Sequence, residues 1–172
     1  MHRVLIFVLA MCLLSPACMR VPTTPSAGES QSSSKGSEAT LAGAAGKITD
    51  ACSVMPADLI QKIVPGGAAP QSEQFPRRCS VSNGKSVLEI TIETGLITPT
   101  DPVKGAEYIP GLALGGYLER LDPASRGDTY LTVILGKDPN GLLHVEVAGH
   151  DGKDHKDDAI GVARDILARL RQ

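Results

Sequence analysis

A β-hairpin expected in residues 78–94 decides the fold, and this stretch reads RCSVSNGKSVLEITIET. Asn83-Gly84 is the strongest short signal for a hairpin turn, because both residues tolerate the positive φ angles that a two-residue turn needs. After the turn, Leu88, Ile90 and Ile92 alternate with polar residues. This period of two predicts a strand with one buried face and one face toward water.

A second hairpin is expected between residues 129–135 and 142–148. The intervening residues 136–141 contain two Gly, one Pro, one Asp and one Asn, which favour a turn. Every second residue of the later strand is apolar, so His144 and Glu146 share its other face. The alternation assigns that face to solvent or to a covering helix.

Helical patterns flank the strands on both sides. Pro56 suits the first position of a short helix over residues 57–64, and the Pro-Gly-Gly of residues 65–67 ends it. Residues 156–171 carry apolar side chains at helical spacing, with an acidic first turn and a basic last turn that suit the helix dipole. The order predicts an α+β fold, in which a short N-terminal helix and an amphipathic C-terminal helix pack on an antiparallel sheet of about five strands.

The N-terminus has the pattern of an export signal. Met1-His2-Arg3 precedes an apolar run of 11 residues from Val4 to Leu14. As a helix this run would span about 17 Å, against about 30 Å of membrane hydrocarbon. The run is too short to anchor the chain, so residues 1–17 are expected to be a signal peptide.

Cleavage after Ala17 would leave Cys18 at the new N-terminus, and two interpretations fit this site. Ser15 and Ala17 satisfy the small-x-small rule of ordinary secretory cleavage. The same stretch also resembles a bacterial lipobox, whose cysteine receives diacylglycerol. The number of cysteines favours the lipobox, because three sulfurs survive export and lipidation of the first leaves one pair. We therefore expect a protein anchored by its lipid to the extracytoplasmic face of the cell membrane.

The remaining pair, Cys52 and Cys79, is expected to form a disulfide that stabilises the domain by constraining the unfolded chain. A metal pair or a redox couple is the alternative interpretation. It is weaker, because the spacing contains no CxxC motif and offers no third or fourth ligand.

Composition divides the mature chain into two parts. Residues 18–46 are rich in Ser, Gly, Thr and Pro, and we expect them to form a disordered tether behind the lipidated cysteine. Residues 47–172 are then a single α+β domain. Aromatic residues make up only 3% of the chain, Trp is absent and the net charge is −2. These values give no indication of a nucleic-acid partner.

Three segments carry a family resemblance: residues 50–56 (DACSVMP), residues 64–67 (VPGG) and residues 78–81 (RCSV), the last followed by an alternating strand. Together they resemble the actinobacterial lipoproteins of the DUF3558 type, although Ala51 stands where that family usually has Pro. The resemblance implies an envelope location, a structural disulfide and an α+β domain. The family's function is unknown, so the resemblance implies no catalytic residues.

Residues 150–158, which read HDGKDHKDD, form the main concentration of possible metal ligands. Asp151, Asp154 and Asp158 would suit Ca²⁺, and His150 with His155 would suit Zn²⁺. The spacing departs from the calcium-loop motif, however, and two lysines would repel a cation. A solvated loop with helix-capping acids is the preferred interpretation, and we expect no metal and no cofactor.

His144 beside Glu146 could perform acid–base catalysis, but an exposed pair on a strand is the simpler interpretation. The sequence contains no common motif for a nucleophile, a catalytic metal or a phosphate. We therefore expect a protein without catalytic residues.

Residues 95–115 are expected to form a long loop. It contains six apolar or aromatic residues that either pack on the core or line a groove: Leu96, Ile97, Val103, Tyr108, Ile109 and Leu112. The function expected is a non-enzymatic domain that binds a protein partner or a small envelope ligand. The alternatives are a carrier or sensor of a lipid or glycolipid, with an apolar cavity, and more remotely a hydrolase.

Overall fold

The computed structural model describes residues 34–95, 104–120, 128–137, 140–149 and 151–172. The expected signal peptide, the lipidation site Cys18 and the first part of the expected tether lie outside these residues.

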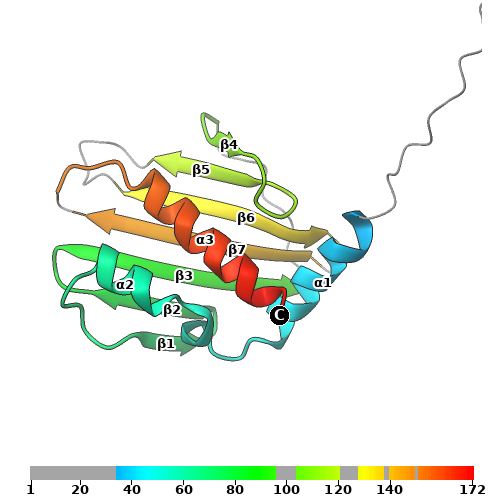
Figure 1. Ribbon diagram of the computed structural model, residues 1–172, viewed down its shortest axis with the longest axis horizontal. Coiled ribbons are helices and arrows are strands. Elements are labelled where there is room, and N and C mark those ends of the chain that lie inside the picture. The colour runs from blue at the N-terminus through cyan, green and yellow to red at the C-terminus, as the bar shows by residue number, and fades with distance from the viewer. Residues whose placement is uncertain (1–33, 96–103, 121–127, 138–139, 150) are drawn as a thin grey trace, which may run out of the picture. The chain divides into compact units, whose positions relative to one another are not determined.

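One antiparallel sheet organises the domain, in the strand order β1-β2-β3-β7-β6-β5-β4 (Figure 1). Its strands are β1 (Gln71–Gln74), β2 (Arg77–Ser82), β3 (Ser86–Gly95), β4 (Glu107–Ile109), β5 (Gly116–Arg120), β6 (Thr129–Lys137) and β7 (Asn140–Gly149). The two expected hairpins are β2–β3 and β6–β7, and β3 pairs with β7 along its whole length. The α+β class with an antiparallel sheet is therefore confirmed.

The prediction of about five strands is wrong, because the described residues form seven. Two of the seven are short edge strands without a clear apolar alternation. β1 is exposed at all four positions, and β4 is three residues long and lies inside the segment expected to be a loop.

Helices cover one face of this sheet. They are α1 (Ser34–Lys47), the 3₁₀ turn η1 (Ala51–Val54), α2 (Ala57–Ile63) and α3 (Lys156–Leu170). In Figure 1, α3 crosses β6 and β7 while α2 lies over β3 and β2. Among the described residues, no helix combines the length and the apolar character needed to cross a membrane.

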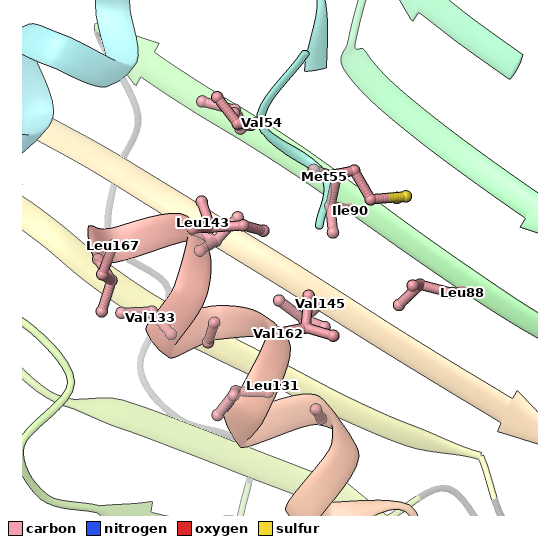
Figure 2. Close-up of a cluster of buried hydrophobic side chains, with 14 of the residues drawn as sticks. Val54, Met55, Leu88, Ile90, Leu131, Val133, Leu143, Val145, Val162 and Leu167 are labelled. Carbon is pink, nitrogen blue, oxygen red and sulfur yellow. The ribbon is translucent and has the colours of Figure 1, made fainter. Parts of the chain in front are cut away.

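The core lies between these helices and the sheet. Figure 2 shows Val162 and Leu167 of α3 above Leu131, Val133 and Val145 of the central strands. All five are at most 2% exposed. The strand residues alternate with polar neighbours, so the pattern that predicted the strands also fixes which face of the sheet meets the helices.

Helix α1 corrects the expected boundary of the tether. The segment expected to be disordered reaches residue 46, but a helix begins at Ser34, and Leu41, Ala42 and Ala45 are at most 2% exposed. Small residues allow this contact: a Cβ added to Gly141 of β7 would lie only 3.0 Å from the Cβ of Ala42. The helix is poor in large apolar side chains, yet it packs because backbone and methyl groups approach closely.

Arg77 of β2 holds the C-terminal end of α1. Its Nη1 donates hydrogen bonds to the carbonyls of Ala45 (2.9 Å) and Ile48 (2.8 Å), and its Nη2 donates to Oγ1 of Thr94. These bonds add donors at the end of the helix, where carbonyl groups lack their usual helical partners, although the Ala45 carbonyl also accepts from the Ile48 amide (3.2 Å). The guanidinium therefore couples α1 to the sheet.

The expected disulfide between Cys52 and Cys79 is present, with a Cα–Cα distance of 4.9 Å. Asp50 begins η1 as its N-cap, accepting hydrogen bonds from the Cys52 amide (2.9 Å) and the Ser72 hydroxyl (2.6 Å). The disulfide joins η1 to β2, and the Asp50 side chain joins η1 to Ser72 of β1. Together these contacts hold the N-terminal part of the domain against the edge of the sheet.

Candidate functional site

The sheet face opposite the helices is the candidate site, and no described helix packs on it. We call it the open face. Its side chains come from six strands and from the residue before β6: Arg78 (β2), Glu89, Thr91 and Glu93 (β3), His144 and Glu146 (β7), Tyr130 and Thr132 (β6), Tyr117 and Glu119 (β5), Tyr108 (β4), and Asp128. Most of them are half-buried, because neighbouring side chains on a pleated sheet shield one another.

An aromatic row crosses this face. We define it as the directly paired residues Thr91, His144, Thr132, Tyr117 and Tyr108, which come from β3, β7, β6, β5 and β4. The rings of Tyr108 and Tyr117 lie 5.6 Å apart, and Tyr108 is 55% exposed. The chain contains three tyrosines, and all three lie on the open face, since Tyr130 occupies the neighbouring row.

His144 lies at the centre of the open face. Its Nδ1 is 3.1 Å from Oγ1 of Thr132, and its ring stacks on that of Tyr130 at 5.5 Å. Burial lowers the pKa of His144, and the nearby carboxylate of Glu93 offsets this only in part. The imidazole is therefore expected to be neutral at pH 7, with Nε2 3.9 Å from Glu93, beyond hydrogen-bond distance.

A second row carries the acidic groups. We define this carboxylate row as Glu89, Glu146, Tyr130 and Glu119, which are paired directly across β3, β7, β6 and β5. Burial and the carboxylates of Glu89 and Asp128 raise the pKa of Glu146. Burial also raises the pKa of Tyr130 to about 12, helped by the four surrounding glutamates of the open face. Burial is the larger cause of both shifts, and the contributions of the neighbouring carboxylates indicate a region of negative potential.

Most of these acidic groups form no ion pair with the described residues. Arg78 pairs with Glu73 (2.6 Å) and Glu89 (3.5 Å). Among the described residues, no ion pair involves Glu119, Glu146 or Asp128.

Three carboxylates near the helices do form ion pairs. Lys62 pairs with Asp158 at 2.9 Å, and Arg120 pairs with Asp154 at 2.9 Å. Lys156 also forms an ion pair with Glu107. Among the described residues Asp58 and Asp165 on the helices also form no ion pair, but they are isolated and exposed, whereas the unpaired carboxylates of the open face are half-buried and close to one another.

A depression of about 270 Å³ lies beside the carboxylate row, where it adjoins Glu146 on the side toward the β2–β3 turn. Glu146, Asp128 and Val87 line it, with Lys85 at the adjoining hairpin. Oδ1 of Asp128 is buried and accepts no hydrogen bond from the described residues. This end of the open face is therefore concave and acidic.

The candidate metal ligands of residues 150–158 are engaged in other contacts. His155 is buried, and its ring nitrogens lie 3.2 Å from Asp151 and 3.3 Å from Asp158. Oδ1 of Asp154 accepts a hydrogen bond from the backbone amide of Lys156 at the start of α3. His150 lies outside the described residues, within which no group of three or more possible metal ligands occurs. These contacts fix the connection from β7 to α3.

The long loop expected over residues 95–115 is partly strand. Ile109 and Leu112 are 6% and 0% exposed, so they pack into the core. Tyr108 instead joins the open face. Leu96, Ile97 and Val103 lie outside the described residues.

Two other depressions lie away from the open-face rows. One, of about 420 Å³, lies between α1 and the end of α3 and is lined by Ala44, Ile48 and Leu170. The other, of about 450 Å³, adjoins the turn of Phe75, which is 93% exposed.

The sequence placed His144 and Glu146 on one strand face, and the sheet confirms this. It did not identify the carboxylate nearest His144, which is Glu93 on β3, or the stacking partner Tyr130 on β6. Those neighbours depend on strand order and register, for which this single sequence gave no signal.

No protein family model, curated protein or solved structure matches the chain.

Proposed function

We propose that the chain is an exported lipoprotein of the DUF3558 type, anchored to the membrane through Cys18, whose domain binds a protein partner through the open face. The observation that carries the binding role is the difference between the two faces of the sheet. One face is covered by helices, whereas the other presents three tyrosines, a histidine whose pKa is lowered by burial, and carboxylates that form no ion pair with the described residues. Aromatic side chains are enriched in protein interfaces, where they contribute large contact areas.

A role without catalysis agrees with the surroundings of His144. Among the described residues, no hydrogen bond joins this histidine to a serine or cysteine that could act as a nucleophile. Its contacts are with Thr132, Tyr130 and Glu93, and they suit a fixed surface rather than a proton relay.

The lipid-carrier alternative has one observation in its favour, the depression of about 420 Å³ beside α1. Lys47 and Arg169 contribute to its lining together with the apolar side chains. The space between α3 and the sheet is occupied by fully buried Leu, Ile and Val side chains. Binding on the open face is the better supported role.

Radical footprinting of the tyrosines tests the proposed binding role. Hydroxyl radicals would be applied to the full chain in membranes of its native host and to the purified chain in neutral detergent micelles. Tyr108 and Tyr117 should be oxidised more slowly in the membranes, whereas Phe75, which is 93% exposed at the opposite edge of the sheet, should react equally in both. Equal oxidation of the tyrosines in both samples would contradict a partner on the open face.

Anchoring is tested separately with a Cys18→Ala variant and with mass analysis of the mature N-terminus. The proposal predicts a diacylglycerol adduct on Cys18 and loss of the variant from the membrane fraction. A variant that is retained in the membrane fraction would contradict the anchor and leave the binding test unaffected.

A further inference from the structure

We infer that the open face binds an extended, positively charged protein segment, with Lys or Arg at alternate positions. This inference rests on the proposed function, because it names the chemistry of the partner at the same surface. The open face carries five carboxylates, from Glu89, Glu93, Glu119, Glu146 and Asp128. The basic residues described near them are Arg78 and, at the edge of the depression, Lys85.

The arrangement of these carboxylates is unfavourable for the isolated domain. Glu89 and Glu146 are directly opposite each other on adjacent strands, and like charges at such positions destabilise a sheet. Arg78 reaches Glu89 but is also bonded to Glu73. Arg78 therefore compensates the repulsion only in part, and a cationic partner would offset the remainder.

The dimensions of the carboxylate row suit an extended chain. From Glu89 on β3 to Glu119 on β5 the row crosses three strand intervals, or about 14 Å at the usual strand spacing. An extended segment places every second side chain about 7 Å apart, so three alternate basic residues would span the same distance. The segment would run across the strands, with its basic side chains directed at the glutamates.

The aromatic row adds a second kind of contact for the same cations. The Tyr108 and Tyr117 rings lie beside the carboxylate row, and an ammonium or guanidinium group is attracted to the face of such a ring. Nucleic acids and anionic lipid headgroups would instead be repelled by the carboxylates. The observations therefore favour a basic polypeptide segment.

Fluorescence anisotropy with two capped, labelled decapeptides tests this inference. One is an alternating Lys-Ser peptide, and the other an alternating Glu-Ser peptide of the same length. The full chain would be held in nanodiscs of neutral phosphatidylcholine, so that the membrane itself does not bind either probe. The Lys-Ser peptide should bind with an affinity that falls as salt is added, and the Glu-Ser peptide should not bind.

Matched charge variants locate the binding. Glu119→Gln with Glu146→Gln removes two charges from the carboxylate row, and Asp58→Asn with Asp165→Asn removes two from exposed positions on α2 and α3. The first variant should bind the Lys-Ser peptide more weakly, by about two- to fivefold for each carboxylate removed, and the second should bind as the wild type does. Equal weakening in both variants would overturn the inference, because it would show attraction to the overall charge.

Failure of this inference can be separated from failure of the proposed function. If the tyrosines are protected in native membranes but the Lys-Ser peptide does not bind, the face has a partner of different chemistry and the inference is wrong. Self-association of the chain that disappears in the Glu119→Gln, Glu146→Gln variant would assign the face to a second copy, and would also overturn the inference.

Discussion

Replacement of Glu146 by Gln should stabilise the folded domain at pH 7. The carboxylate is partly buried, faces Glu89 directly across the β3–β7 pair, and lies near Asp128. An amide keeps nearly the same shape and removes the negative charge. Relief of one directly opposed like-charge pair is worth roughly 0.2–1 kcal/mol. We therefore expect the free energy of unfolding to rise by about 0.5 kcal/mol, the middle of that range.

The stabilisation should depend on pH in a defined direction. Because the pKa of Glu146 is raised in the folded state above its ordinary value of 4.5, the folded state binds this proton more tightly than the unfolded state does. The penalty on the wild type is then complete above the folded-state pKa and disappears as the pH falls below 4.5. The advantage of Glu146→Gln should accordingly vanish near pH 4.

Urea unfolding at pH 7 and pH 4 measures this effect, with Asp165→Asn on the exposed side of α3 as the matched control. The control should change stability by less than about 0.5 kcal/mol, as surface substitutions usually do. A Glu146→Gln variant that is less stable than the wild type at pH 7, or whose advantage persists unchanged at pH 4, would refute the electrostatic reasoning. Either of these results would also count against the inference that the open face binds a cationic partner.

Three further predictions concern the scaffold. Replacing Cys52 and Cys79 together by Ala should lower the free energy of unfolding by about 3.5 kcal/mol, because the disulfide closes a loop with a sequence separation of 27; urea unfolding under non-reducing conditions checks this. Gly149→Ala should lower the free energy of unfolding, because the added Cβ would lie 2.6 Å from Nε2 of the buried His155. Gly161→Ala in α3 is the matched control, because its added Cβ meets no atom within 4 Å. It should raise the free energy of unfolding by about 0.5–1 kcal/mol in the same assay. Arg77→Met should speed amide hydrogen exchange in α1 and leave α3 unchanged, because it removes the donors that hold the end of α1; equal acceleration in both helices would contradict this role.

The central strands and α3 could be predicted from the sequence because their side chains repeat with the period of the element. Residues 85–94 alternate as a strand with one buried face, and residues 156–171 carry an apolar stripe. Helix α1 could not be found in the same way. Its buried contacts come mostly from Ala42 and Ala45, and a segment rich in Ser, Gly and Ala has the composition of a tether. The close approach of α1 to the sheet also needs a glycine at position 141, which lies about a hundred residues away from α1 in the sequence.

The open face was only partly predictable for a related reason. Alternation alone places His144 and Glu146 together on one face of β7. That Glu89 opposes Glu146, and that Tyr130 stacks on His144, depends on the order β3-β7-β6 and on the register of each pair. A strand pattern fixes the face of a side chain, but tertiary pairing fixes its neighbours.

Fluorine NMR of the full chain labelled with 3-fluorotyrosine is the most direct test of the open face as a binding surface. The chain holds three tyrosines, each on this face, so every resonance reports on it and none reports on the helices. On titration with the Lys-Ser peptide, the resonances of Tyr117 and Tyr130 should shift in proportion to the bound fraction. Peptide binding by anisotropy that leaves all three resonances unmoved would show that the site lies elsewhere on the molecule.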